Sequence, residues 1–145
     1  MPAVCALDTS CMIAAVCGWH EQHRMAAAEI ERRLDRGERL SVAAHALSEA
    51  YAVLTRLPAP HRMSPADAWE VLRANFTDGV MVVALSASQH IALLRRLAKA
   101  GLSGGRTYDA LIAECAVRAG AQTLLTFNDR HFQPAPPGLA IVVPS

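Results

Sequence analysis

The sequence predicts an α/β fold in which helices cover both faces of a mainly parallel sheet. Short apolar runs alternate along the chain with longer segments whose apolar residues recur at helical spacing. This alternation favours a parallel sheet, because a chain must cross over, usually through a helix, before it can add another parallel strand. With 145 residues, of which 52% are hydrophobic, the chain suffices for one domain with its own core. We therefore expect a three-layer α/β/α sandwich around a sheet of four to five strands.

The first apolar run, residues 3–7, has the pattern of a buried strand, and Asp8 follows it directly. Thr9 and Ser10 come next and begin a helix that we expect to reach Val16. Asp, Thr and Ser are all good helix N-caps, so this stretch alone supports a capping role for Asp8 as well as a ligand role. Ligands of open α/β sheets lie just beyond the carboxyl ends of strands, which is where Asp8 falls.

A second helix is expected over residues 21–36, because its apolar side chains recur at helical spacing and Gly37 can end it. The other face of this helix is charged and is expected to face water; it carries Glu29, Arg32, Arg33 and Arg36. His20 and His23 are spaced to chelate a metal, but no third ligand is near in sequence. An exposed helix start therefore explains these two histidines better.

The remaining elements are bounded by cap and breaker residues. Pro58 and Pro60 interrupt the chain, Ser64 and Pro65 have the N-cap and first-turn pattern, and residues 86–89 have capping-box spacing. In order, we expect a strand over 40–42, helices over 43–57 and 65–76, a strand over 80–85, helices over 86–100 and 107–119, and strands over 123–126 and 140–143. The buried stripe expected in the first of these helices consists of Leu47, Ala50, Tyr51, Leu54 and Leu57.

Charge and hydropathy limit the partners of the chain. A formal net charge of +1 provides no broad basic surface, so any RNA or DNA must be held by a local patch or through a metal ion. No apolar run approaches the roughly 20 residues of a membrane span, and no signal-peptide pattern is present, so we expect a cytoplasmic protein. The four cysteines contain no C-x-x-C pair and are expected to be buried thiols.

Acidic or amide side chains recur where the predicted elements meet one rim of the sheet: Asp8, Glu49, Asp109, Asn128 and Asp129. Hard divalent cations prefer oxygen ligands, and clustered carboxylates repel one another unless a cation neutralises them. Each residue also has an ordinary explanation. Glu49 lies off the apolar stripe of its helix, Asp109 suits a first helical turn, and Asp129 suits a turn. The residues alone leave both a metal site and a set of caps and turns open.

Three stretches resemble a known family: residues 4–10 (VCALDTS), 107–113 (TYDALIA) and 124–132 (LLTFNDRHF). In order and spacing they resemble PIN-domain ribonucleases over nearly the whole chain, and the size and layout resemble the VapC toxins of VapBC toxin–antitoxin systems. Leu47 to Tyr51 matches the segment in which this family carries a glutamate. The resemblance implies a single PIN domain over residues 1–145 with the PIN-like α/β/α sandwich.

The same resemblance implies that Asp8, Glu49 and Asp109 surround Mg²⁺ or Mn²⁺, which activates water to cleave a structured cellular RNA such as tRNA or rRNA. The fourth acid of the family falls at Asn128 here, so an amide that could hold a metal-bound water replaces a carboxylate, unless Asp129 substitutes for it. The residues implied to contact metal-bound waters or the scissile phosphate are Thr9, Ser10 and Thr107. The nearest candidates for other phosphate contacts are Arg106, Arg130 and Lys99, although a plain surface charge explains each of them better.

Partners are also implied by the resemblance. It predicts a VapB-type antitoxin whose C-terminal segment crosses the helices near the active site, and it predicts a homodimer. Met25, Ile30 and Leu54 would serve these contacts, although core packing explains them equally well.

Two other functions were weighed. A Mg²⁺-dependent phosphomonoester hydrolase would use Asp8 as its nucleophile, but such enzymes typically carry an acid two residues later, where this chain has Ser10. A degenerate PIN module that only binds RNA or protein is supported by Asn128 and opposed by the presence of Asp8, Glu49 and Asp109.

Overall fold

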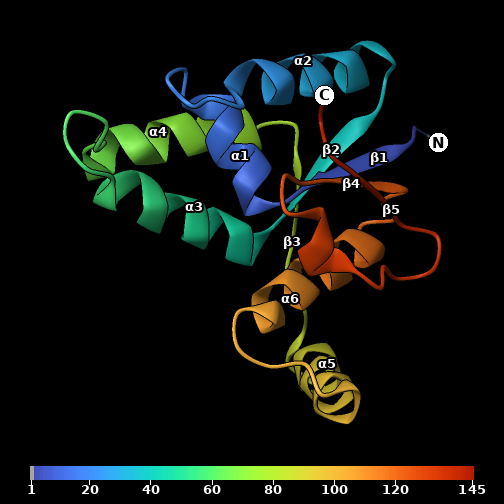
Figure 1. The fold of residues 1–145 in the computed structure, drawn as a ribbon. Coiled ribbons are helices and arrows are strands. Elements are labelled where there is room, and N and C mark those ends of the chain that lie inside the picture. The colour runs from blue at the N-terminus through green and yellow to red at the C-terminus, as the bar shows by residue number, and fades with distance from the viewer. Residues whose placement is uncertain (1) are drawn as a thin grey trace.

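The computed structural model describes residues 2–145 (Figure 1). Strands and helices alternate as the sequence predicts. In chain order they are β1 (Val4–Leu7), α1 (Thr9–Val16), α2 (His23–Asp35), β2 (Arg39–Ala43), α3 (Ala44–Arg56), α4 (Pro65–Phe76), β3 (Met81–Val83), α5 (Ala87–Ala100), α6 (Arg106–Arg118), β4 (Thr123–Leu125), the 3₁₀ helix η1 (Asp129–Phe132) and β5 (Ala140–Val142).

The five strands form one sheet in the order β3-β2-β1-β4-β5, and every neighbouring pair is parallel. The predicted sheet of four to five mainly parallel strands is confirmed. β1 lies at the centre, where Ala6 pairs with Ser41 of β2 on one side and with Leu124 of β4 on the other. Beyond the last pair, the Asp8 amide still donates to the Leu125 carbonyl at 3.1 Å. This hydrogen bond fixes the backbone of Asp8 at the carboxyl end of the central strand.

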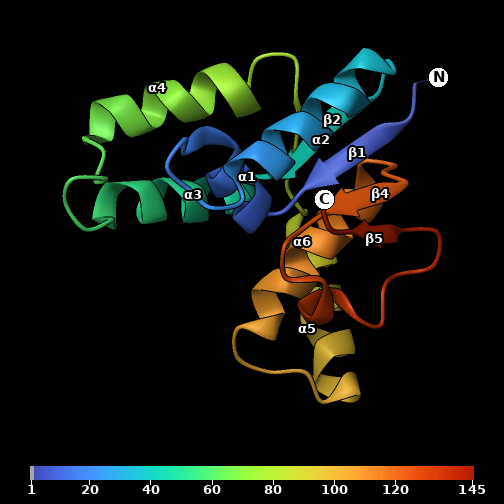
Figure 2. The same ribbon diagram turned by 45° about the horizontal axis from the view of Figure 1, so that its top comes forward.

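The strand order explains the layers. From β1 to β3 the chain moves one way across the sheet, and from β3 it returns past β1 to β4. Since parallel crossovers are right-handed, the two directions place their helices on opposite faces. Figures 1 and 2 show α1–α4 gathered on one side and α5 and α6 on the other. This arrangement is the α/β/α sandwich.

Several local predictions are confirmed. Ser64 caps α4 by accepting from the Asp67 amide, and Pro65 is the first residue of that helix. Ser86 and Gln89 form a capping box at the start of α5. All four cysteines are buried free thiols. No helix within residues 2–145 combines the length and apolarity that crossing a bilayer requires.

Other local predictions are wrong. Tyr51, assigned to the buried stripe of α3, is 38% exposed, and Leu34 of α2 is 51% exposed. α2 begins at His23, later than predicted, and β3 spans only three residues. The two histidines do not form an exposed helix start: both are half-buried, and Nδ1 of His23 lies 2.9 Å from the Ala14 carbonyl oxygen.

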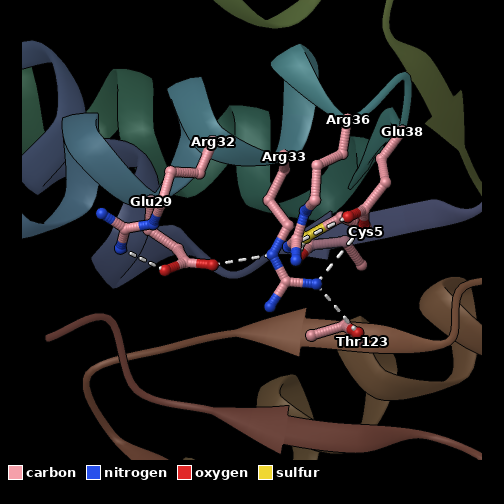
Figure 3. Close-up of polar contacts among 8 residues, drawn as sticks. Cys5, Glu29, Arg32, Arg33, Arg36, Glu38 and Thr123 are labelled. Atoms are coloured by element: carbon pink, nitrogen blue, oxygen red, sulfur yellow. Dashed lines mark hydrogen bonds and ion pairs between the residues drawn. The ribbon is translucent and has the colours of Figure 1, made fainter.

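The charged face of α2 is not simply solvated either. The side chains of Glu29 and Arg33 are only 12% and 13% exposed, because Arg33 reaches over the sheet (Figure 3). Its guanidinium donates to Glu29 at 2.7 Å, to Glu38 at 3.4 Å and to Thr123 of β4 at 3.3 Å. Burial opposes ionisation of Glu29, but hydrogen bonds from Arg32 and Arg33 lower the pKa of its carboxyl. This charged network lies where β4 begins, at the opposite end of the strands from Asp8.

Candidate functional site

The carboxyl ends of β1 and β4 form a topological switch point. The two strands are neighbours, but the connections that follow them turn to opposite faces of the sheet, which leaves a crevice where ligands of open α/β sheets bind. A cleft of about 450 Å³ lies there. Its polar lining consists of Asp8, Thr9, Ser10, His20, Gln22, Glu49, Asp109 and Asn128.

Asp8 is the most buried acid of this cleft, at 4% exposed. Its Oδ1 accepts from the Cys11 amide at 2.9 Å and from the Ser10 hydroxyl at 2.8 Å, and its Oδ2 accepts from the Thr126 hydroxyl at 2.5 Å. Burial raises the pKa of Asp8 to about 6 despite these three hydrogen bonds, and the nearby Asp109 adds repulsion. Asp8 thus caps α1, as one of the two expectations had it, and its carboxylate also lines the cleft.

Thr126 was missed as a site residue. It is fully buried, and besides donating to Asp8 it accepts from the Asn128 amide at 2.8 Å. The Ser10 hydroxyl makes a second connection between the same two turns, because it accepts a hydrogen bond from the Phe127 backbone amide at 3.1 Å. These bonds fix the turn after β4 against the turn after β1. A hydroxyl residue at the end of the late strand was the available signal, but its role depends on the unpredicted pairing of β4 with β1.

Glu49 reaches the cleft from the second turn of α3. Its side chain is 37% exposed, and Oε1 accepts from the Thr9 hydroxyl at 3.2 Å. Nε2 of His45 lies 3.2 Å from the same oxygen, although the two groups are not aligned for a hydrogen bond. Glu49 is therefore held toward α1, which the helical periodicity of α3 alone could not show.

Asp109 lies in the first turn of α6, and its side chain is 23% exposed. Burial raises the pKa of this carboxyl, and Glu49 raises it further by repulsion, while His131 and Arg106 act in the opposite direction. Nδ1 of His131 lies 3.6 Å from Oδ2 of Asp109. Asp109 therefore feels the charges of both Glu49 and Asp8, which come from different elements.

The other predicted residues divide between the cleft and its surroundings. Asn128 lines the cleft, whereas the exposed Asp129 begins η1 outside the lining. Arg106 donates to the Gln133 carbonyl at 2.8 Å and lines a neighbouring, more apolar cleft of about 470 Å³ that shares Asp109. Thr107 is half-buried at the start of α6, and Arg130 is exposed on η1. His20, which the sequence analysis assigned to an exposed helix start, lines the acidic cleft, whereas His23 does not.

The residues of the cleft fit a hard divalent cation. Three carboxylates and one amide offer oxygen donors, and the raised pKa values of Asp8 and Asp109 show that their charges lack compensation. As the side chains lie, no three acidic, histidine or cysteine groups within residues 2–145 form a closed ligand set. Mg²⁺ does not need one, since it usually takes one or two protein carboxylates directly and keeps several waters.

Comparisons with known proteins agree with this geometry. The family model described as "PIN domain" matches residues 5–135. The chain is 43% identical over 119 residues to Ribonuclease VapC40 of Mycobacterium tuberculosis, which covers 82% of this chain and 83% of that protein.

Solved structures share the fold. VapBC2 from Rickettsia felis, bound to a DNA fragment from its promoter, matches with a TM-score of 0.68 at 20% identity, covering 98% of this chain and 99% of that one. M. tuberculosis VapC20, described as a sarcin–ricin loop cleaving toxin, matches with a TM-score of 0.68 at 17% identity, covering 92% and 97%.

Proposed function

The chain belongs to the PIN-domain family and is a VapC-type ribonuclease, and from this premise we propose that its acidic cleft holds a divalent cation and is the site of RNA cleavage. One observation carries the proposal. Asp8 is buried at the end of the central strand, with its pKa raised to about 6, in a cleft that it shares with Glu49, Asp109 and Asn128. An acid kept there at a cost to stability is typical of a functional site.

We assign Mg²⁺ or Mn²⁺ to this cleft, with Asp8, Glu49 and Asp109 as the carboxylates that hold it and Asn128 as a neutral donor to the ion or to one of its waters. Held by these residues, such a cation would supply positive charge to the developing negative charge on the phosphate and would lower the pKa of nearby water. The hydrolysis breaks the bond from phosphorus to the 3′ oxygen and leaves 5′-phosphate and 3′-hydroxyl ends.

The chain itself supplies orientation. Hydrogen bonds from Thr126, Ser10 and the Cys11 amide to Asp8 fix the direction of both carboxylate oxygens and favour the charged form, against the effect of burial. Thr9 does the same for Glu49. Because these donors come from the first turn of α1 and from the residue that follows β4, the cleft is organised before RNA arrives.

The RNA phosphates need positive partners beside this acidic cleft. We assign this role to Arg106 and Arg130, with the Thr107 hydroxyl at the positive end of the α6 dipole. Asp129 faces solvent in the same turn as Arg130 and is not required as a metal ligand. A formal net charge of +1 favours recognition of a particular RNA shape over general RNA binding.

We propose that the substrate is a structured cellular RNA, a tRNA or an rRNA loop, and that the chain acts in the cytoplasm, where these RNAs lie. The similarity to VapC20 supports an rRNA loop as one candidate. We further propose a VapB-type antitoxin as the partner, which the solved VapBC structures of the same fold support, and a homodimer as the assembly. Leu54 is fully buried and cannot contribute to either contact, whereas Met25 is 36% exposed.

The two other functions fit less well. A phosphomonoester hydrolase that used Asp8 as its nucleophile would typically carry a second acid two residues later, where this chain has Ser10, whose hydroxyl donates to Asp8. A degenerate binding module would not need to retain Asp8 and Asp109, two carboxylates whose pKa values are raised by burial and by repulsion from neighbouring acids.

The test is cleavage of purified tRNA and rRNA by the free protein, in Mg²⁺ and in excess chelator. Asp8→Asn and Asp109→Asn are compared with Asp35→Asn, a change at an exposed acid at the end of α2. We expect discrete cuts, dependent on Mg²⁺, from the parent and Asp35→Asn only. Cuts that persist in both cleft variants would refute the proposal.

A further inference from the structure

Two aromatic rings stack beside the acidic cleft. The imidazole of His45, in the first turn of α3, and the phenol ring of Tyr108, in the first turn of α6, lie with their centroids 4.9 Å apart and their planes within 5° of parallel. The two residues come from helices on opposite faces of the sheet. Their rings therefore meet beyond its edge, on the side to which both helix starts point.

The stack lies at the rim of the cleft. Tyr108 immediately precedes Asp109, and His45 lies one helical turn before Glu49, with its Nε2 3.2 Å from the Glu49 carboxylate. Asp109 and Glu49 line the cleft, whereas the two rings do not. A group that stacked on the Tyr108 ring would thus lie next to a phosphate bound in the cleft near Asp109 and Glu49.

Only one end of the stack is covered. His45 is half-buried, with 29% of its side chain exposed, whereas Tyr108 is 52% exposed even though one face of its ring packs on the imidazole. About half of the Tyr108 surface thus stays accessible although His45 covers one face of its ring. An aromatic ring held flat by a neighbour and open on its other side is ready to continue the stack with one more ring.

We propose that Tyr108 is the stacking platform for an unpaired RNA base next to the scissile phosphate, and that His45 is a positioning residue that holds the phenol ring in place. This inference rests on the proposed ribonuclease function, because RNA is the ligand that brings a flat aromatic base and a phosphate to the same place. Base stacking on aromatic side chains is how proteins commonly bind unpaired RNA, and it tolerates different bases.

The chemistry around the stack agrees with this occupant. Arg106 and the positive end of the helix dipole belong to the first turn of α6, which also carries Tyr108. A base on Tyr108 would place its own phosphates against these positive groups and away from the repulsive carboxylates. Tyr108 thereby selects RNA segments whose bases are splayed out, as in loops.

The experiment measures RNA binding and cleavage separately. Binding is measured in the full chain carrying Asp8→Asn, which is expected not to cleave, with a 10-nucleotide single-stranded RNA that contains one 2-aminopurine. We expect the fluorescence of this base to fall on binding, because stacking quenches it. Tyr108→Ala is expected to weaken binding by about 5- to 150-fold, the range found when a stacking aromatic is removed, and to abolish the quenching.

Matched variants separate stacking from folding. Tyr108→Phe keeps the ring and is expected to bind within about two-fold of the parent. Tyr51→Ala removes an exposed tyrosine from the opposite side of α3 and should change neither binding nor quenching. In the cleavage-competent chain, Tyr108→Ala should raise KM far more than it lowers kcat, because it removes binding made equally in the ground and transition states.

The outcomes are distinguishable. If the parent cleaves RNA and Tyr108→Ala matches it in both KM and binding, the platform is refuted while the ribonuclease assignment stands. If Tyr108→Ala weakens only the binding of an antitoxin peptide, the ring is a protein contact and the inference is wrong. If the parent does not cleave RNA but binds it through Tyr108 with quenching, the proposed function fails and the stacking assignment remains.

Discussion

Thr126 donates its hydroxyl hydrogen to the Asp8 carboxylate at 2.5 Å and so joins the ends of two neighbouring strands that are 118 residues apart in sequence. The same hydroxyl accepts a hydrogen bond from the backbone amide of Asn128, so one buried side chain positions both Asp8 and the Asn128 backbone. The geometry of the site therefore depends on the register of β4 against β1 as much as on the carboxylates themselves.

Thr126→Val keeps the shape of this side chain and removes both hydrogen bonds. We expect the unfolding free energy to fall by about 1–3 kcal/mol, because Asp8 and the Asn128 amide lose a buried partner. RNA cleavage should fall by about 10- to 100-fold, as is typical when a group that orients a metal ligand is removed. Urea denaturation and cleavage rates check this, and Thr126→Ser should retain most of both. A fully active valine variant would contradict the role of this hydroxyl.

Asp8 makes the stability of the metal-free chain depend on pH. Its pKa is about 6 in the fold and 3.8 ordinarily, so the folded chain keeps a proton that the unfolded chain releases. The contribution of Asp8 to the unfolding free energy is therefore greatest below about pH 4, and this contribution is lost as the pH rises through about 6. At about 1.4 kcal/mol per pKa unit, Asp8 costs about 3 kcal/mol at neutral pH.

Urea denaturation in chelator, at pH values between 4 and 8, measures this effect. The parent should lose stability across that window relative to Asp8→Asn, which carries no titrating group at this position. Parallel pH profiles for the two proteins would show that Asp8 ionises in the fold as readily as it does in the unfolded chain.

Asn128 and Asp129 should respond differently to substitution. Asn128→Asp adds a fourth carboxylate to the cleft, so we expect tighter Mg²⁺ binding and a lower melting temperature without metal, because the acids repel one another. Asp129→Asn changes an exposed residue and should alter stability by less than about 0.5 kcal/mol and leave Mg²⁺ binding unchanged. Thermal melts with and without Mg²⁺ test both. If Asp129→Asn instead lost Mg²⁺ binding, Asp129 and not Asn128 would be the residue that contributes to the metal site.

Arg33 should matter for stability and not for cleavage. It joins Glu29, Glu38 and Thr123 at the opposite end of the strands from the cleft, so Arg33→Met removes the more buried arginine partner of two carboxylates that keep only Arg32 and Arg36. We expect a loss of about 1–3 kcal/mol of unfolding free energy with an unchanged cleavage rate per folded molecule. Arg24→Ala, at an exposed arginine in the first turn of α2, is the matched control. A cleavage defect in Arg33→Met would mean that this network influences the site.

The sequence predicted those parts of the molecule that depend on local pattern. The strand that ends at Asp8, the Ser64 cap and the capping box from Ser86 to Gln89 all follow from neighbouring residues, and the structure confirms them. Asp8 could not be assigned to one role from its surroundings because it has two: it caps α1 and it lines the cleft.

The features that the sequence missed all depend on pairs that lie far apart in the chain. Helical periodicity made Glu49 an ordinary solvated residue, since its contact with Thr9 requires α3 to pack beside α1. Arg33 was placed on an open face because the covering residue, Thr123, belongs to a strand ninety positions later. The importance of Thr126 likewise depends on the strand order, which the pattern of elements does not fix.

The most direct test of the account is a calorimetric titration of Mn²⁺ into the metal-free protein at pH 7.5. The account predicts that the parent and Asp35→Asn bind Mn²⁺, that Asp8→Asn and Asp109→Asn lose at least ten-fold in affinity, and that Glu49→Gln weakens binding as well. Binding of Mn²⁺ with equal affinity by Asp8→Asn and the parent would contradict the claim that this cleft holds the ion.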